Sequence, residues 1–479
     1  MTVEENKMDS VGQQPPPPQP DGFLGKVANY FDFAENRTNF RTETLAGVAT
    51  FMTMAYILVV NPLILSDAIF LQESGDLFTE LAVATAVSAA IGTLAMAFLA
   101  NYPFALAPGM GINAFFAYTV VLGLGIDWRV ALACVFVEGL VFIVLTLTDI
   151  RRHLITAIPS AIKAATTVGI GLFLALIGLK GNPEIGGAGL IVPNEVTFVS
   201  FGNIAQPQTI MAIVGILLTA FFLARGIRGA LLWGIVGTAL LGWVFGIAPP
   251  PEGIVSLPAA PTHLFGAAFT GLAELTGGNA WDFIAVLFVF LFVDMFDTIG
   301  TLAGVGTQAG YIDENGELPK ANKALSADAI ATTTGAIMGT SSVTTFVESA
   351  AGVAEGGRTG FTALVVAALF VVSLIFTPIF AAIPGFATAP ALLIVGVFMM
   401  ASITTIRWQD ITEALPAFLT IFFIPFGFSI AEGLALGLIT YPLMKIFAGK
   451  PQDVPVVTWI LAVIFVARFI FMAVRFGEI

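Results

Sequence analysis

Hydrophobic residues recur along the chain in blocks of about 20, and short polar or Gly- and Pro-containing stretches separate these blocks. A block of this length can cross a membrane as a helix. Strands of a membrane barrel would instead alternate apolar and polar residues with a period of two, and the chain lacks that alternation. The pattern therefore predicts an all-α polytopic membrane protein. The blocks give fourteen transmembrane segments, near residues 44–64, 79–100, 103–120, 129–147, 156–179, 208–225, 229–247, 281–305, 322–339, 341–355, 361–383, 388–406, 411–429 and 431–447.

Two parts of the chain lie outside these segments. Residues 1–43 are polar and contain the Pro-rich run "QQPPPPQPDG", so we expect a cytoplasmic N-terminal tail that is disordered over residues 1–22. No positively charged start precedes an apolar stretch there, so no secretory signal is expected. The C-terminal part, 450–479, contains a further apolar block at 454–475, which either spans the membrane or lies on its surface.

Composition supports the membrane assignment. Of the 479 residues, 57% are hydrophobic and 11% are charged, and the mean hydropathy is +0.93, which excludes a soluble globule of this length. The single cysteine, Cys134, and the two histidines, His153 and His263, are far apart in sequence, so neither a disulfide framework nor a Cys/His metal site is expected. We expect a lipid bilayer as partner, and no cofactor, metal or nucleic acid.

The distribution of Lys and Arg predicts the orientation in the membrane. With a cytoplasmic N-terminus, only Arg129 and Lys180 lie clearly outside, and the first outer connection, with Asp67, Glu73 and Asp76, carries no Lys or Arg. We therefore expect this orientation. The positive residues that it places on the cytoplasmic side are Lys26, Arg37, Arg41, Arg151, Arg152, Arg225, Arg228, Lys320, Lys323, Arg358, Arg407, Lys445 and Lys450.

Two predicted segments contain residues that interrupt helices. The third, "ALAPGMGINAFFAY", holds Pro108 and Gly109, and the tenth, "GTSSVTTFVESAAG" at Gly339–Gly352, is rich in Gly, Ser and Thr. Seven segments per half would make the halves inverted copies, and the two interrupted segments then occupy corresponding positions. Because irregular backbone at membrane depth is tolerated only inside protein or facing water, such a pair indicates a transport site.

Three carboxyl side chains inside predicted segments are the strongest candidates for chemistry. Asp294 and Asp297, in "FLFVDMFDTIGT", are spaced i, i+3 and therefore fall on one helix face. A charge at a helix centre costs about 2.5–3.5 kcal/mol on insertion scales, so we expect these side chains to face a cavity. Glu348 lies in the interrupted tenth segment. Because desolvation disfavours the charged form of a carboxyl group, Asp294 and Glu348 are candidates for proton uptake and release. The alternative is a structural role, in which a carboxylate braces the broken segment.

Other polar and aromatic residues in the segments carry weaker signals. Asn113 offers an amide donor and acceptor to a polar ligand, and Phe346, beside Glu348, is placed to stack on a planar one. For Glu138 and Lys163 we favour structural roles, because neither lies in an interrupted segment.

Four long motifs together resemble one family of transporters. The chain is similar to the AzgA-like branch of the nucleobase and ascorbate transporter superfamily, purine permeases for adenine, guanine and hypoxanthine, from about Asp32 to Gly449. The motifs that carry the resemblance are "FRTETLAGVATFMTMAYILVVNP", "APGMGINAFFAY", "VDMFDTIGTLAGVG" and "GTSSVTTFVESAAGVAEGGRTG".

The resemblance implies fourteen segments in two inverted repeats of seven. A core domain would comprise residues 44–147 and 281–383, and a gate domain residues 156–247 and 388–449. The third and tenth segments would each pair a short strand with a half-helix, and the strands would meet beside the substrate. Dimers are common in the superfamily, which makes a homodimer an open possibility.

The resemblance also implies a substrate site. The family-like positions are Asn113 on the third segment, Asp294 and Asp297 on the eighth, and Glu348 on the tenth. Backbone near Ala114 and Val347 would add hydrogen bonds, and Thr53 or Ala55 would line the pocket.

From these observations we predict a secondary active transporter in the plasma membrane that imports purine nucleobases by proton symport. One alternative is a transporter of another planar or anionic solute on the same fold, although Glu348 and the two aspartates would repel anions. A facilitative purine channel is a second alternative. An intramembrane aspartyl protease is a third, which we disfavour because Asp294 and Asp297 lie on one helix and we find no other mid-segment aspartate to oppose them.

Overall fold

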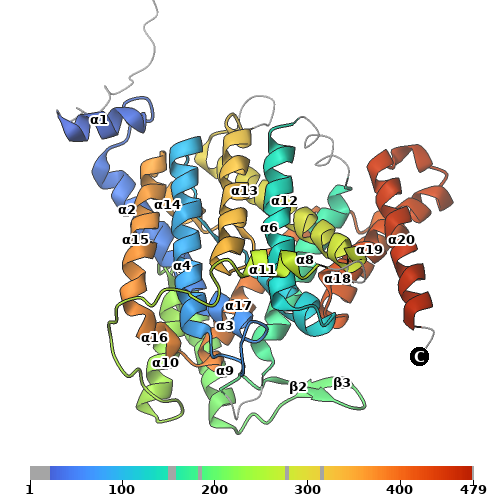
Figure 1. Ribbon diagram of the computed structural model, residues 1–479, viewed down its shortest axis with the longest axis horizontal. Helices are drawn as coiled ribbons and strands as arrows, with labels where there is room; N and C mark the ends of the chain where they lie inside the picture. Colours follow the sequence, from blue (N-terminus) through green and yellow to red (C-terminus); the bar gives the residue numbers. More distant parts are fainter. Residues whose placement is uncertain (1–21, 149–157, 182–185, 276–279, 313–317, 477–479) are drawn as a thin grey trace, which may run out of the picture.

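A computed structural model describes the chain except for residues 1–21, 149–157, 182–185, 276–279, 313–317 and 477–479 (Figure 1). The disorder expected for residues 1–22 therefore falls, apart from Gly22, outside the described residues, as do Arg151, Arg152 and His153. The described chain is a largely helical multi-pass membrane protein, as its hydrophobic pattern predicts. Nine helical stretches in the described ranges are long and apolar enough to cross a membrane.

The first half of the chain forms nine described α-helices. Met96–Ala100 and Phe115–Gly123 continue α4 and α5 as π-helical turns. The helices are α1 (Phe23–Tyr30), α2 (Phe40–Met54), α3 (Ile57–Ser66), α4 (Phe78–Ala95), α5 (Met110–Ala114), α6 (Trp128–Thr146), α8 (Ser160–Leu179), α9 (Pro207–Ala224) and α10 (Ala230–Val244).

The second half contains the longest helix, α12, and ends in α20, which packs beside α19 and places Phe465 against Phe288 of α12. Its helices are α11 (Ala267–Ala273), α12 (Ala280–Ala309), α13 (Ala321–Met338), α14 (Ser349–Ala354), α15 (Gly360–Ser373), α16 (Thr377–Ala381), α17 (Gly385–Met400), α18 (Ile411–Phe426), α19 (Ile430–Phe447) and α20 (Val456–Phe476).

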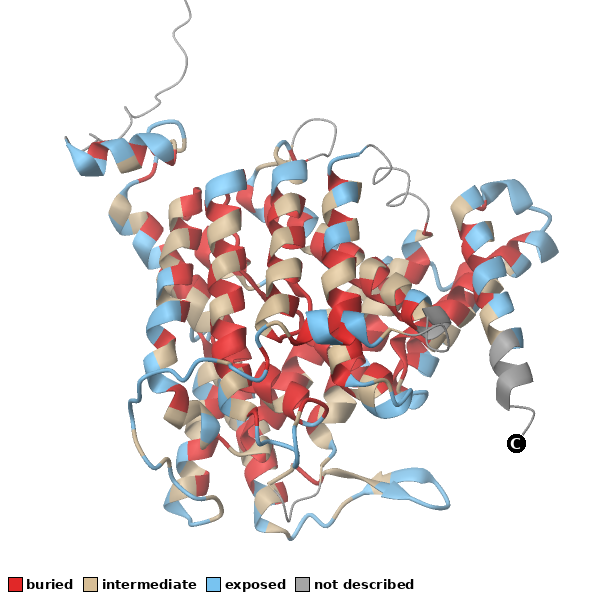
Figure 2. Ribbon diagram, viewed as in Figure 1, coloured by how far each residue is buried: buried red, intermediate tan, exposed pale blue. Residues whose placement is uncertain are grey.

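Three elements lie outside the segments that the hydrophobic blocks predict. The helices α1 and α11 are too short to appear as blocks, and the hairpin of β2 (Ile191–Asn194) and β3 (Phe198–Phe201) lies in a connection. Asn194 makes the hairpin turn, since its side-chain oxygen accepts hydrogen bonds from the N–H groups of Val196 and Thr197. Figure 2 shows the exposed residues of this hairpin projecting from the helical body.

Two short strands meet inside the helical body. β1 (Leu106–Pro108), in the third predicted segment, pairs antiparallel with β4 (Val343–Thr345), in the tenth. All six residues are buried. Hydrogen bonds from Gly109 N to Ser342 O and from Phe346 N to Ala105 O, both 2.9 Å, extend the ladder at its two ends. The two interrupted segments thus satisfy each other's backbone groups where no water is available.

Glycine permits the close approach of the third segment to its neighbours. A Cβ atom on Gly109 would lie 2.7 Å from the Thr344 side chain, and one on Gly111 would lie 2.5 Å from Ile170 of α8. Any larger residue would therefore push β4 or α8 away. This explains the glycines that look, in the sequence, like defects of a membrane helix.

The membrane helices pack in two groups. The first group is α2, α3, α4, α6, α12, α13, α14 and α15, and the second is α8, α9, α10, α17, α18 and α19. Figure 1 shows α15, α4, α13 and α6 of the first group side by side. Contacts between the groups are fewer, and the contact of α10 with α2 is one of them.

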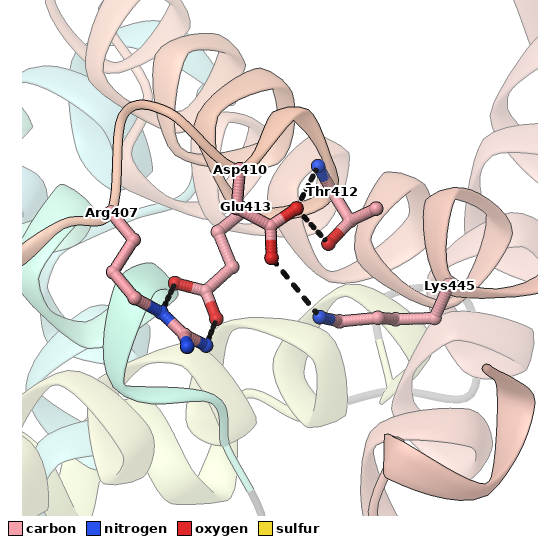
Figure 3. A network of polar contacts seen from close by, with 5 residues as sticks. All are labelled: Arg407, Asp410, Thr412, Glu413 and Lys445. Atoms are coloured by element: carbon pink, nitrogen blue, oxygen red, sulfur yellow. Dashed lines mark hydrogen bonds and ion pairs between the residues drawn. The ribbon is translucent and has the colours of Figure 1, made fainter. Parts of the chain in front are cut away.

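Ion pairs tie α18 to α19 and to the connection that precedes α18 in the second group (Figure 3). Asp410 caps α18 by accepting hydrogen bonds from the Thr412 hydroxyl, at 2.7 Å, and the Thr412 N–H, at 3.0 Å, and these bonds lower the pKa of the Asp410 carboxyl. Lys445 of α19 lies 4.0 Å from the same carboxylate. Arg407 binds Glu413 through two nitrogens. These charged contacts therefore hold α18 against α19 and against the connection that precedes α18.

We expect Thr93→Val to destabilise the strand pair. The Thr93 hydroxyl accepts from Leu106 N at 2.9 Å and donates to Leu106 O at 3.0 Å, on the edge of β1 that β4 does not cover. The isosteric valine leaves both groups buried and unpaired, at a cost of about 1–3 kcal/mol in unfolding free energy. Thermal unfolding followed by tryptophan fluorescence measures the loss.

Thr238→Val is the matched control for this change. Thr238 is equally buried, but its hydroxyl donates to Gly234 O within its own helix, α10, where the helical ladder already satisfies that carbonyl. Equal shifts for the two variants would contradict a special role for Thr93.

Candidate functional site

Glu348 stands where β4 gives way to α14. Its Oε1 atom accepts a hydrogen bond of 2.8 Å from the hydroxyl of Tyr56, and the Thr53 hydroxyl lies 3.4 Å from its backbone oxygen. Tyr56 is 1% exposed and occupies the short interruption between α2 and α3. The break between α2 and α3 therefore places the Tyr56 hydroxyl next to the Glu348 carboxyl group, just after β4.

The chain beside Glu348 borders open space. Val347 is 54% exposed, although Phe346 before it is only 6% exposed and β4 is fully buried. Glu348 is half-buried and Asp297 of α12 is exposed. Asp297 and Glu348 interact electrostatically. Two acidic side chains and an apolar one thus face the same region, where they offer hydrogen-bond acceptors and a surface for a planar ligand.

Asp297 also lines a narrow cavity between the two helix groups. The cavity has about 30 Å³ of space for water, and its other polar lining residues are Lys163, Thr166 and Thr167 of α8. The Lys163 ammonium lies 5.1 Å from the centre of the Phe296 ring. Sequence reasoning assigned Lys163 a structural role, and the structure places it beside a candidate site residue.

A larger cavity, of about 250 Å³, lies on the same boundary near the connection between α3 and α4. Residues of α3 and α8 line it, together with Asp67, Tyr118 and Lys180. The Tyr118 hydroxyl donates to Asp67 at 2.7 Å, and Lys180 lies 5.0 Å from the ring centre of Phe428. Burial raises the pKa of the Asp67 carboxyl. Both cavities therefore lie where one helix group faces the other.

Asn113 lies apart from Glu348. It is fully buried, and its amide donates to the side-chain oxygen of Asn61 in α3. Asn61 in turn donates to Thr85 at 2.7 Å and to Thr340 at 3.0 Å. Ala114 and Ala55, at 0% and 3% exposure, are buried as well. In this conformation Asn113 connects the third segment to the first membrane helix and to the residues before β4.

Asp294 is also closed off from the space beside Glu348. It is fully buried, accepts a hydrogen bond from Thr332 at 3.2 Å, and lies within hydrogen-bonding reach of Glu138 on α6. Glu138 accepts from Ser342, just before β4, at 2.9 Å. The structure thus separates Asp294 from Asp297, although their spacing places them on one helix face.

Sequence reasoning missed two residues. The expectation that no other mid-segment aspartate opposes Asp294 and Asp297 is wrong, because Asp328 of α13 is fully buried beside Asp294. It accepts hydrogen bonds from Thr298 at 2.9 Å and Thr345 at 3.3 Å. The sequence could have identified Asp328, because it lies inside the predicted segment 322–339. Tyr56 carries no such signal, since no glycine stands at the break between α2 and α3.

Two interrupted segments that meet in the interior beside carboxyl groups define a multi-pass membrane transport protein. A family model described as the permease family matches residues 41–436, and the chain belongs to this family. It is therefore a transporter and not an enzyme.

Relatives of known name cover almost the whole chain. A permease of Methanocaldococcus jannaschii is 51% identical and covers 93% of this chain and 99% of its own length. The guanine/hypoxanthine permease PbuO of Bacillus subtilis is 43% identical, with 91% and 98% coverage. The adenine permease AdeP of Escherichia coli is 41% identical, with 94% and 97% coverage.

Solved structures share the fold at low sequence identity. The transmembrane domain of a cyanobacterium bicarbonate transporter, BicA, has a TM-score of 0.60 at 18% identity and covers 83% of this chain and 97% of that one. The structure of SLC26A9 has a TM-score of 0.61 at 12% identity, with 88% and 70% coverage. These likenesses describe the architecture alone.

We expect Asn113→Ala to lower stability through Asn61. The change leaves the buried Asn61 Oδ1 atom without its donor, which costs about 1–3 kcal/mol in unfolding free energy. Asn61→Ala removes the other partner, so a double-mutant cycle measured by thermal unfolding should give losses that do not add. Strictly additive losses would contradict the contact, and Asn203→Ala in an exposed loop is the neutral control.

Proposed function

We propose that this protein imports purine nucleobases, namely guanine, hypoxanthine or adenine, by proton symport. The observation that carries the proposal is the half-buried Glu348 carboxyl, which accepts a hydrogen bond from Tyr56 just after a buried strand and follows the exposed Val347. Membership of the permease family and the names of the bacterial relatives support a purine as the substrate.

The proposed architecture has fourteen crossings in two inverted repeats. The first helix group corresponds to a core domain of residues 44–147 and 281–383, and the second to a gate domain of 156–247 and 388–449. The two packing groups support this division. The strand and short helix of the third segment match those of the tenth, which supports the repeat. We place the protein in the plasma membrane with a cytoplasmic N-terminus, because that orientation puts most positive charges inside.

The purine would bind between Glu348, Asp297 and the residues around Val347. The carboxylate of Glu348 accepts hydrogen bonds from ring and amino N–H groups, and Thr53 lies at the edge of the same region. Phe346 and the backbone of Ala114 and Val347 complete the proposed pocket. Ala55 and Asn113 support it from behind, through α3.

Proton coupling would use Asp294 and Glu348. Glu348 and Asp297 carry like charges that interact with each other, and such a pair favours a bound proton over two free charges. A protonated carboxyl can donate to a ring nitrogen or carbonyl, and an ionised one can accept from an N–H group. Proton and base would then load together, and the core would move against the gate to switch access.

An anion is a poorer substrate for this site. The fold likeness to a bicarbonate transporter concerns architecture, and here two carboxyl groups face the space in which an anion would have to bind. A channel is distinguished from a carrier by saturable uptake and competition among purines.

We expect Glu348→Gln to abolish concentrative purine uptake. The amide retains the shape of the side chain but loses the charge that accepts purine N–H groups, so affinity falls by roughly tenfold or more, as for the loss of a hydrogen bond to a charged group. Uptake of labelled guanine, hypoxanthine and adenine in cells that lack purine transport measures the effect.

Glu195→Gln, in the exposed hairpin turn, is the matched control for this experiment. A protonophore should abolish concentrative uptake by the wild-type protein. Normal uptake by Glu348→Gln would refute the proposed site, and uptake that the protonophore leaves unchanged would refute proton coupling.

We expect Tyr56→Phe to raise the KM for purines and to leave the maximal rate nearly unchanged. The change frees the Glu348 carboxyl to turn away from the pocket, and the lost bond to a charged group corresponds to about tenfold in KM. Tyr30→Phe removes an exposed hydroxyl and is the control. A fall in maximal rate at constant KM would indicate that Tyr56 acts on the conformational step instead.

A further inference from the structure

Three carboxyl side chains from three helices converge behind β4. Glu138 of α6, Asp294 of α12 and Asp328 of α13 are each 0% exposed. None of the three forms an ion pair with a Lys, Arg or His in the part of the chain that the structure describes. No group of three or more His, Cys, Asp or Glu side chains in the same described ranges is placed so that it could hold a metal ion. The cluster must therefore balance its negative charge in another way.

One oxygen on each of two adjacent carboxyl groups has no hydrogen-bond partner. These atoms are Oε1 of Glu138 and Oδ1 of Asp294, and the two carboxyl groups lie within hydrogen-bonding reach of each other. The remaining oxygens are occupied, since Glu138 accepts from Ser342 and Asp294 accepts from Thr332. A buried acceptor without a donor is costly, and two adjacent carboxylates cannot both be ionised in an apolar interior.

We infer that Glu138 and Asp294 share one proton, and that this proton is taken up and released during transport. The proton forms the O–H of one carboxyl group and donates to the unpartnered oxygen of the other. This inference rests on the proposed symport, and it adds Glu138, which lies outside the substrate region, to the transport machinery.

The pair is connected to the substrate site through β4. Glu138 accepts a hydrogen bond from Ser342 at the start of the strand, and the single hydrogen of the Thr332 hydroxyl can be donated either to Asp294, at 3.2 Å, or to the backbone oxygen of Val343, at 3.0 Å. When the proton leaves, the two carboxylates repel each other and pull on both contacts. Glu348 stands just past the other end of the same strand, so purine binding and proton binding act on one element.

The other titratable groups near the pair are few. Cys134 lies on α6 with Glu138, Asp297 lies one turn along α12, and Asp328 faces the pair from α13. The Asp328 carboxyl already receives hydrogen bonds from two threonine hydroxyls, one to each of its oxygens. Within this cluster, the oxygens that lack a hydrogen-bond donor are therefore those of Glu138 and Asp294.

Infrared difference spectroscopy of the purified full-length protein tests the shared proton. We expect a carbonyl stretching band of a protonated carboxylic acid at neutral pH, and its loss in Glu138→Gln and in Asp294→Asn. Glu43→Gln is the matched control. Glu43 is equally buried, but both of its oxygens have donors, since they accept hydrogen bonds from Arg358 N, Thr359 N and the Thr362 hydroxyl.

Transport in proteoliposomes tests the role of that proton. The amide introduced by Glu138→Gln would donate permanently to Asp294, so we expect this variant to retain purine counterflow and to lose accumulation driven by an imposed pH gradient. Counterflow requires a folded carrier and therefore separates a coupling defect from misfolding.

Each outcome decides a different point. The shared proton is refuted if the wild-type spectrum lacks the carboxylic acid band, or if the band persists in a folded Glu138→Gln or Asp294→Asn variant. One folded variant is sufficient for this comparison. Gradient-driven accumulation by Glu138→Gln overturns its role in coupling. If purine uptake by the wild-type protein does not depend on the pH gradient, the proposed symport itself is refuted, independently of the infrared result.

Discussion

The pairing of β1 with β4 is the constraint on which the rest of the structure depends. Extended backbone inside a membrane exposes N–H and C=O groups that water cannot reach, so each strand needs the other. Their register fixes the starts of α5 and α14 relative to each other. Threonines then close the outer edges, Thr93 from α4 and Thr332 from α13. The helices around the pair are thus arranged to complete hydrogen bonds that the broken segments leave open.

This arrangement gives chemically identical side chains two different environments. Glu348 and Asp297 lie where β4 ends and border open space, where they can meet a ligand. Glu138 and Asp294 lie behind β4 in the buried interior, where a proton is the simplest way to satisfy both. Hydroxyl groups, rather than charges, connect the second pair to the strand. Their bonds are weak enough to rearrange when a charge changes.

Hydrophobic blocks and helix-breaking residues were sufficient to predict the largely helical fold and to single out the two interrupted segments. They were not sufficient to orient side chains within the fold. Asp294 and Asp297 are separated by about 60° around the helix axis, and the boundary between buried and open surroundings falls in that interval. Asn113 lies in an interrupted segment, yet its amide is turned toward Asn61. The direction of each side chain depends on packing between segments that are distant in sequence, and a local sequence pattern does not predict that packing.

The placement of these groups relative to the two helix groups bears on how transport and coupling are combined. Both cavities lie on the boundary between the groups, and Asp297 lines the smaller one, so a relative movement of the groups would change access to Asp297. Glu138, Asp294 and Asp328 all belong to helices of the first group and keep their neighbours during such a movement. A proton held there stays out of contact with both aqueous faces unless β4 shifts. The strand that shapes the ligand site would then also be the element that admits or releases this proton, which would tie proton binding behind β4 to purine binding at its end.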